Sequence, residues 1–123
     1  MNHKRPINLN LFTIRFPLPA IISILHRVSG AALFILIPAI LWLLDYSLTS
    51  DGYDDIQLWL ESPMLKFIFW ILLIPFCYHL VAGVRHLLSD IHIGDTLKAG
   101  NLTAKLALII SGVFVVLLGL WLW

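Results

Sequence analysis

The sequence predicts an all-α integral membrane protein with three transmembrane helices, in a single domain that covers residues 1–123. Hydrophobic residues make up 60% of the chain and charged residues 12%, whereas soluble domains are about half apolar and about a quarter charged. Three runs without a charged residue are each long enough to be candidates for membrane-spanning helices: 28–44, 67–84 and 106–123. The net charge of +1 gives no indication of a nucleic-acid partner.

The expected spans are 21–44, 65–88 and 104–123, because Lys and Arg beside an apolar run can reach the interface and so extend it. Two of these spans contain a proline, Pro38 in the first and Pro75 in the second. Proline is tolerated inside a transmembrane helix when neighbouring groups bond the freed carbonyl, and it predicts a kink in both helices.

The distribution of positive charge predicts which side of the membrane each connection faces. Seven of the eight Lys and Arg residues precede the first charge-free run or lie between the second and the third: Lys4, Arg5, Arg15, Arg27, Arg85, Lys98 and Lys105. The connection 45–66 carries only Lys66. Because loops rich in Lys and Arg stay in the cytoplasm, the N-terminus and the connection 85–105 are expected to be cytoplasmic. The connection 45–66 and the C-terminus are expected to be periplasmic.

Residues 1–19 lack the apolar segment of a signal peptide and the Arg- and Ser-rich composition of an organelle transit peptide. A bacterial inner membrane is therefore the expected location. A single cysteine, Cys77, excludes an internal disulfide. Since three helices enclose little space, a protein partner within the membrane is also expected.

His79 lies inside the second span, with no charged residue within five positions on either side. It precedes Arg85 by about 9 Å along a helix, which places it in the hydrocarbon layer. A polar side chain at this depth is costly and normally pairs inside the protein. One interpretation is a hydrogen bond between helices. The other is an axial ligand of haem iron, since a zinc site would need further ligands and no second His, Cys or carboxylate is expected at this depth.

Gly83 and His86 follow His79 by one and two helical turns and share its face. A glycine there would let a flat macrocycle approach the backbone, although it would serve close helix packing equally well. Arg85 and His86 lie near the cytoplasmic interface, where haem propionates would emerge; for Arg85 the alternative is an ordinary positive flank. Asp90 either orients His86 or caps the span.

At the start of the first span, Ser23, His26 and Arg27 fall at i, i+3 and i+4 on one helical face. They are compatible with a polar helix cap followed by an arginine at the interface. They are equally compatible with a quinone site, because a quinone needs donors for its carbonyls while its tail stays in lipid. A serine can donate a hydrogen bond, an arginine can polarise an oxygen and an imidazole can move a proton near neutral pH.

Residues 5–30 (RPINLNLFTIRFPLPAIISILHRVSG) and 79–90 (HLVAGVRHLLSD) closely resemble the cytochrome b subunit of succinate dehydrogenase, the membrane anchor of respiratory complex II. The resemblance covers nearly the whole chain, with three spans in this order and direction. The motifs S-x-x-H-R-x-S-G and H-x-x-x-G-x-R-H-x-x-x-D are more specific together than alone. His92 stands where relatives often have glycine, so the loop 91–100 is expected to be shaped differently.

The resemblance implies that His79 is an axial ligand of haem b and that the second ligand comes from another membrane anchor subunit. It also implies that Ser23 and Arg27 line a site for ubiquinone, the substrate. The candidate contacts of the haem propionates are His26, Arg27, Arg85 and His86. The implied partners are a flavoprotein subunit with FAD and an iron–sulfur subunit with its clusters, and a trimer of heterotetramers is a candidate assembly.

The expected function is therefore that of a subunit of succinate:quinone oxidoreductase, which supplies binding and orientation and is not catalytic alone. Electrons from succinate oxidation would pass to ubiquinone beside this chain, in the respiratory chain and the tricarboxylic acid cycle. Other interpretations stay open: the anchor of a quinol:fumarate reductase, which works in the opposite direction, and a purely structural anchor or small transporter component without haem.

A reporter that is active only outside the cytoplasm should work when it is fused after Trp123 or within 51–55, and should be inactive within 95–100. The reason is that connections rich in Lys and Arg are retained in the cytoplasm. Reporter assays on whole cells check the three fusions. The reverse pattern of activity would contradict the charge argument.

Overall fold

The computed structural model describes residues 13–94 and 96–123, and these residues form four helices and no strand. The helices are α1 (Leu18–Ser47), α2 (Ser50–Glu61), α3 (Pro63–Asp90) and α4 (Leu97–Leu122). The predicted all-α fold is therefore confirmed.

Three of these helices are long and apolar enough to cross a membrane, as predicted. α1, α3 and α4 contain 30, 28 and 26 residues. At about 1.5 Å per residue they measure about 45, 42 and 39 Å, whereas the hydrocarbon core of a bilayer is about 30 Å thick. The helices therefore extend into the polar interface or tilt. The chain is a multi-pass membrane protein, and the expected spans 21–44, 65–88 and 104–123 lie within these helices, apart from the last residue.

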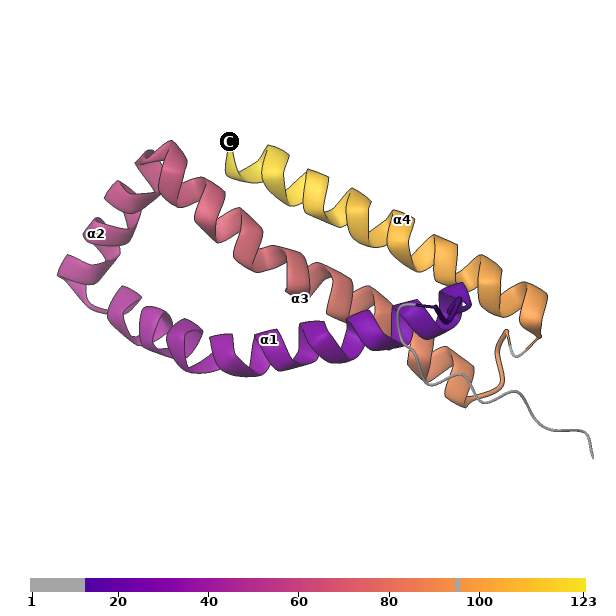
Figure 1. Ribbon diagram of the computed structural model, residues 1–123. Coiled ribbons are helices and arrows are strands. Elements are labelled where there is room, and N and C mark those ends of the chain that lie inside the picture. Colours follow the sequence, from indigo (N-terminus) through magenta and orange to yellow (C-terminus); the bar gives the residue numbers. More distant parts are fainter. Residues whose placement is uncertain (1–12, 95) are drawn as a thin grey trace, which may run out of the picture.

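The prolines are accommodated in two different ways. Pro38 and Pro75 lie inside α1 and α3, and both helices continue past them. Pro63 occupies the first turn of α3, where the missing N–H has no helical partner to lose. Figure 1 shows α1 as a curved helix.

α2 is an element that the sequence did not predict. Its 12 residues lie in the connection 45–66, whose mixed polarity contains no apolar run. Thr49 caps the helix, because its hydroxyl accepts a hydrogen bond from the N–H of Gly52 (3.1 Å). Tyr46, at the end of α1, donates a hydrogen bond to Asp55. α2 contacts both α1 and α3 and bridges them where they are far apart (Figure 1).

α3 is the central helix, since it packs against all three others. α1 and α3 lie together near the start of α1 and the end of α3, and they diverge toward α2 (Figure 1). α4 runs back alongside α3, where Trp123 meets Trp70 edge to face with ring centroids 6.4 Å apart. The indole N–H of Trp70 donates to the main-chain oxygen of Val115 (2.8 Å), which ties α3 to α4 at this end.

The small hydrophobic core lies at the opposite end, where α1, α3 and α4 meet. It consists of Ile22, Ala82 and Ala104, each fully buried, with Leu18 and Tyr78 packed against it. Alanines permit close approach of the helix backbones, and the Tyr78 hydroxyl donates to the main-chain oxygen of Ile22 (2.9 Å). Most other large apolar side chains are exposed, so lipid or partner subunits must cover them.

Two of the described residues in the connection between α3 and α4 have left-handed backbone. His92 has φ 64° and Gly94 has φ 86°. Glycine adopts this conformation at little cost, whereas other residues rarely do. His92 therefore takes the type of backbone conformation that a glycine would favour. Thr96 then begins α4 by accepting a hydrogen bond from the N–H of Ala99 (3.2 Å).

Replacing the buried Ala82 by Leu should lower the thermal stability of the chain, because its core has no room for a larger side chain and overpacking typically costs about 1–3 kcal/mol. The same change at the exposed Ala39 is the matched control and should have little effect. Thermal unfolding of the purified membrane complex measures both. Equal melting temperatures for the two variants would show that the core around Ala82 is not tightly packed.

Candidate functional site

Three imidazoles come together where α1 meets α3, and we call them the histidine cluster: His26, His79 and His86. The ring of His26, from α1, stacks on that of His79, from α3, with centroids 4.0 Å apart and 14° between the ring planes. The His26 ring also lies near that of His86, with centroids 5.0 Å apart and a tilt of 46°.

The helical repeat and two glycines produce this arrangement. His79 and His86 are two turns apart and lie on the same face of α3. A Cβ atom on Gly30 would lie 2.9 Å from Cε1 of His79, and one on Gly83 would lie 3.3 Å from Nε2 of His26. Larger residues at these positions would displace the rings, so both glycines serve close packing of α1 on α3.

Hydrogen bonds hold the His79 ring at its Nδ1 atom. This atom lies 3.1 Å from Oγ of Ser29 and 3.1 Å from the main-chain oxygen of His26. Ser29 is buried, and its hydroxyl donates to the same oxygen of His26 (2.8 Å). Both recorded hydrogen bonds of the His79 ring are thus at Nδ1, and its Nε2 atom takes part in neither.

The other two rings of the histidine cluster each keep a buried nitrogen without a partner. Nε2 of His26 and Nε2 of His86 have no hydrogen bond within the described part of the chain. A buried polar atom without a partner costs about 1–3 kcal/mol. Among the described residues, these two nitrogens are buried without a compensating hydrogen bond.

His26 lies closer to His79 than its sequence position predicts. Its place beside Arg27 predicts an imidazole near the interface, and no second histidine is expected at the depth of His79. The structure shows the two rings in contact, so this prediction is wrong. Residue counts give the spacing within one helix, whereas the offset of α1 along α3 depends on how their side chains pack.

Ser23 and Arg27 lie one turn apart on α1, close in sequence to the histidine cluster. Ser23 is half-buried and Arg27 is exposed. No hydrogen bond or ion pair of either side chain is recorded within residues 13–94 and 96–123. Both side chains are therefore without a hydrogen-bond partner among these residues.

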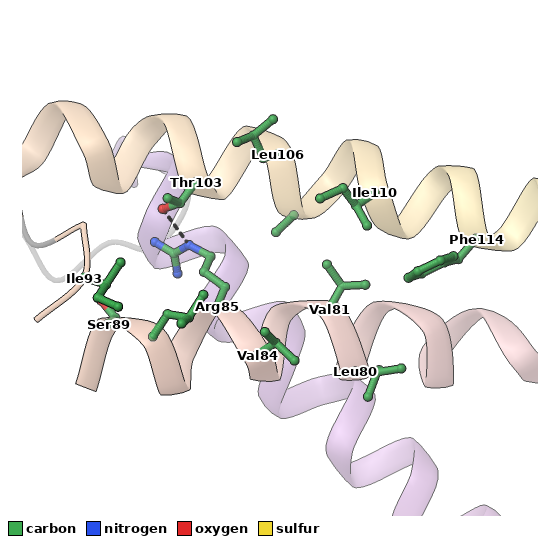
Figure 2. A pocket seen from close by; sticks show the side chains of 12 residues that line it. Leu80, Val81, Val84, Arg85, Ser89, Ile93, Thr103, Leu106, Ile110 and Phe114 are labelled. Carbon is green, nitrogen blue, oxygen red and sulfur yellow. Dashed lines mark hydrogen bonds between the residues drawn. The ribbon is translucent and has the colours of Figure 1, made fainter. Parts of the chain in front are cut away.

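Arg85 contacts α4 and is not part of the histidine cluster. Its Nε donates to Oγ1 of Thr103 (3.2 Å) and its Nη2 to the main-chain oxygen of Gly100 (3.3 Å). Figure 2 shows it at the polar end of a pocket of about 460 Å³ between α3 and α4, which is otherwise mostly apolar. The guanidinium keeps further N–H donors for another partner.

Ser29 is the site residue to which sequence reasoning assigned no role. A serine in an apolar helix often bonds a carbonyl of its own helix, and Ser29 does so. Its contact with a histidine 50 positions further along the chain depends on the packing of α1 on α3. The only signal in the sequence is its place in the motif S-x-x-H-R-x-S-G.

The donor set restricts the kind of metal centre that the site can form. The described residues contain no group of three or more His, Cys, Asp or Glu side chains that could hold a metal ion by itself. An imidazole of the histidine cluster could serve as a ligand to a metal that brings most of its own ligands, as haem iron does.

Comparisons with known proteins found a matching family and several similar proteins. The model of the family described as "Succinate dehydrogenase/Fumarate reductase transmembrane subunit" matches residues 1–121. A protein of Coxiella burnetii named "Succinate dehydrogenase cytochrome b556 subunit" is 38% identical over 125 residues, covering 100% of each chain. Proteins of the same name from Rickettsia prowazekii and Paracoccus denitrificans are 34% and 36% identical, covering 98% and 95% of this chain and 92% and 90% of theirs. The chain belongs to the family of succinate dehydrogenase and fumarate reductase transmembrane subunits.

Proposed function

We propose that this chain is the haem b-binding membrane anchor of succinate dehydrogenase and that it helps to form the site at which ubiquinone is reduced. The observation that carries the proposal is the His79 imidazole, which is held at Nδ1 between two apolar helices and keeps Nε2 for a ligand. The names of the relatives, which are cytochrome b556 subunits, support it.

The residues of the histidine cluster fit haem b. His79 would supply one axial bond through Nε2, and the porphyrin supplies the equatorial nitrogens. The buried, unpaired Nε2 atoms of His26 and His86 are suited to binding the charged propionates. When bound, the haem takes up and releases single electrons.

His26 cannot be the second axial ligand. The rings of His26 and His79 would have to hold the haem iron between them, whereas they lie face to face, 4.0 Å apart. That spacing leaves no room for a macrocycle between them. The second ligand would come from another membrane anchor subunit, with its own histidine inside the bilayer.

Positive charge next to the histidine cluster would bind the propionates further. Arg27 is exposed and free to turn toward them. Arg85 would have to use the guanidinium donors that its bonds to α4 leave open. The proposed propionate contacts are His26, Arg27, Arg85 and His86.

Ser23 and Arg27 would bind the ubiquinone head at the start of α1. A serine hydroxyl can donate a hydrogen bond to a quinone carbonyl. A guanidinium stays charged at any ordinary pH, so that of Arg27 would stabilise negative charge that develops on the quinone oxygen. The quinone tail would remain in the lipid that covers the exposed apolar side chains.

The remaining cofactors belong to partner subunits. A flavoprotein with FAD and an iron–sulfur subunit would oxidise succinate and deliver electrons to the cytoplasmic end of α1, in the respiratory chain and the tricarboxylic acid cycle. The chain would lie in a bacterial inner membrane with its N-terminus in the cytoplasm and its C-terminus in the periplasm. A trimer of heterotetramers is the proposed assembly.

A quinol:fumarate reductase anchor is the second candidate, because the matching family includes fumarate reductase subunits. The relatives named above are all succinate dehydrogenase subunits, which favours the first candidate. In a purely structural anchor, Nε2 of His26 and Nε2 of His86 would stay buried without a hydrogen-bond partner, which is costly.

Replacing His79 by Leu should remove the low-spin b-type haem spectrum of the assembled complex, because leucine has no lone pair for the iron. Difference spectra of dithionite-reduced complex measure this. Succinate oxidation with a soluble dye reports assembly, and Tyr78→Phe is the control that changes a neighbouring ring without removing an imidazole. An unchanged spectrum in the His79 variant would refute the assignment of the ligand.

Replacing Ser23 by Ala should lower succinate-dependent ubiquinone reduction, since one hydrogen bond is worth about 0.5–1.5 kcal/mol and more when the acceptor is charged. Reduction of a soluble dye should persist, because that route bypasses the membrane site. Ser47→Ala, at the other end of α1, is the matched control. If the Ser23 variant keeps normal quinone kinetics, this face of α1 is only an interfacial flank; equal loss of both activities would indicate failed assembly.

A further inference from the structure

We propose that Ser29 is a positioning residue for the haem ligand: together with the main-chain carbonyl of His26, it holds the His79 proton at Nδ1 and directs the lone pair of Nε2 toward the iron. This inference rests on the proposed function, because it concerns the haem that His79 would bind. It goes beyond that function by naming the side chain that determines the tautomer and the ring orientation of His79.

The hydrogen bonds around Nδ1 assign the proton. A carbonyl oxygen can only accept, so the main-chain oxygen of His26, at 3.1 Å, requires an N–H at Nδ1. The Ser29 hydroxyl donates its own hydrogen to the same carbonyl at 2.8 Å. The lone pairs of the Ser29 oxygen are then free to accept a hydrogen bond from Nδ1 of His79, at 3.1 Å. Both acceptors favour one tautomer, and a neutral imidazole of that form carries its lone pair on Nε2.

Contacts on the other sides of the ring fix its orientation. One face stacks on His26, and Cε1 lies where even a Cβ atom on Gly30 would come within 2.9 Å. Ser29 itself is only 7% exposed, so bulk water does not readily replace its oxygen. Rotation of the His79 ring is therefore limited on three sides, all of them provided by α1.

An acceptor at Nδ1–H makes the opposite nitrogen a stronger ligand. Such partners fix the ring orientation of a metal-bound histidine, raise its basicity, and typically change metal affinity by about 10–100-fold when they are lost. A more basic imidazole stabilises the oxidised iron more than the reduced iron. Losing the Ser29 oxygen should therefore raise the haem midpoint potential and weaken haem retention, by about tenfold because the His26 carbonyl remains.

The test compares Ser29→Ala, Ser29→Thr and Ser111→Ala in the assembled complex. Ser111 is a matched control, because it is also buried and its hydroxyl also donates to a carbonyl of its own helix, that of Ala107 (2.6 Å). The measurements are haem content per complex, the haem midpoint potential by redox titration, and the low-spin spectrum.

The expected result is a higher midpoint potential and lower haem content in Ser29→Ala, recovery in Ser29→Thr, which restores the hydroxyl, and no change in Ser111→Ala. An unchanged potential and spectrum in haem-replete Ser29→Ala would overturn the inference and leave the proposed function intact. Equal shifts in Ser29→Ala and Ser111→Ala would also overturn it, since they would reflect general packing. A native complex without b-type haem would instead refute the proposed function.

If Ser29→Ala does not assemble, Ser29→Cys decides the question. A thiol fills similar space but is a weaker hydrogen-bond partner than a hydroxyl. A potential raised above that of the native complex supports the inference, and a native potential overturns it.

Discussion

The contact between Nδ1 of His79 and the main-chain oxygen of His26 determines how α1 can lie on α3. An imidazole in a largely apolar membrane helix is costly unless it is bonded. An offset of α1 along α3 that removed this acceptor would therefore be unfavourable. The observed offset brings the His26 ring against both His79 and His86, and it places the side chain of Ser29 beside the same nitrogen.

The helices pack closely near this contact and separate farther from it. Small residues such as Gly30, Gly83 and Ala82 let the helix backbones come close at that end. Farther along, α1 separates from α3 and α2 bridges the gap (Figure 1), while the Trp70 indole bonds α4. The chain therefore has one tightly packed end, which contains the site, and a long apolar surface that is left for lipid and partner subunits.

The sequence was sufficient for features that depend on composition within one helix: the three apolar helices and the shared face of His79 and His86. It was insufficient for features that depend on how helices meet. The contact of His26 with His79, the contact of Ser29 with His79 and the bond of Arg85 to α4 all depend on how the helices pack. α2 was not predicted because the connection 45–66 contains no apolar run. The helix is held instead by its cap at Thr49 and by the bond from Tyr46 to Asp55.

The bond from the Ser29 hydroxyl to the His26 carbonyl lies within α1 alone, and this has a consequence for biogenesis. During synthesis α1 enters the bilayer before α3, and it does so with this hydroxyl already satisfied. The His79 ring has no such partner inside its own helix and gains one only when α3 reaches α1. Because α1 precedes α3 in the chain, the two oxygens that accept from Nδ1 of His79 would already be in the bilayer when α3 inserts, and the imidazole would be paired when the two helices pack together.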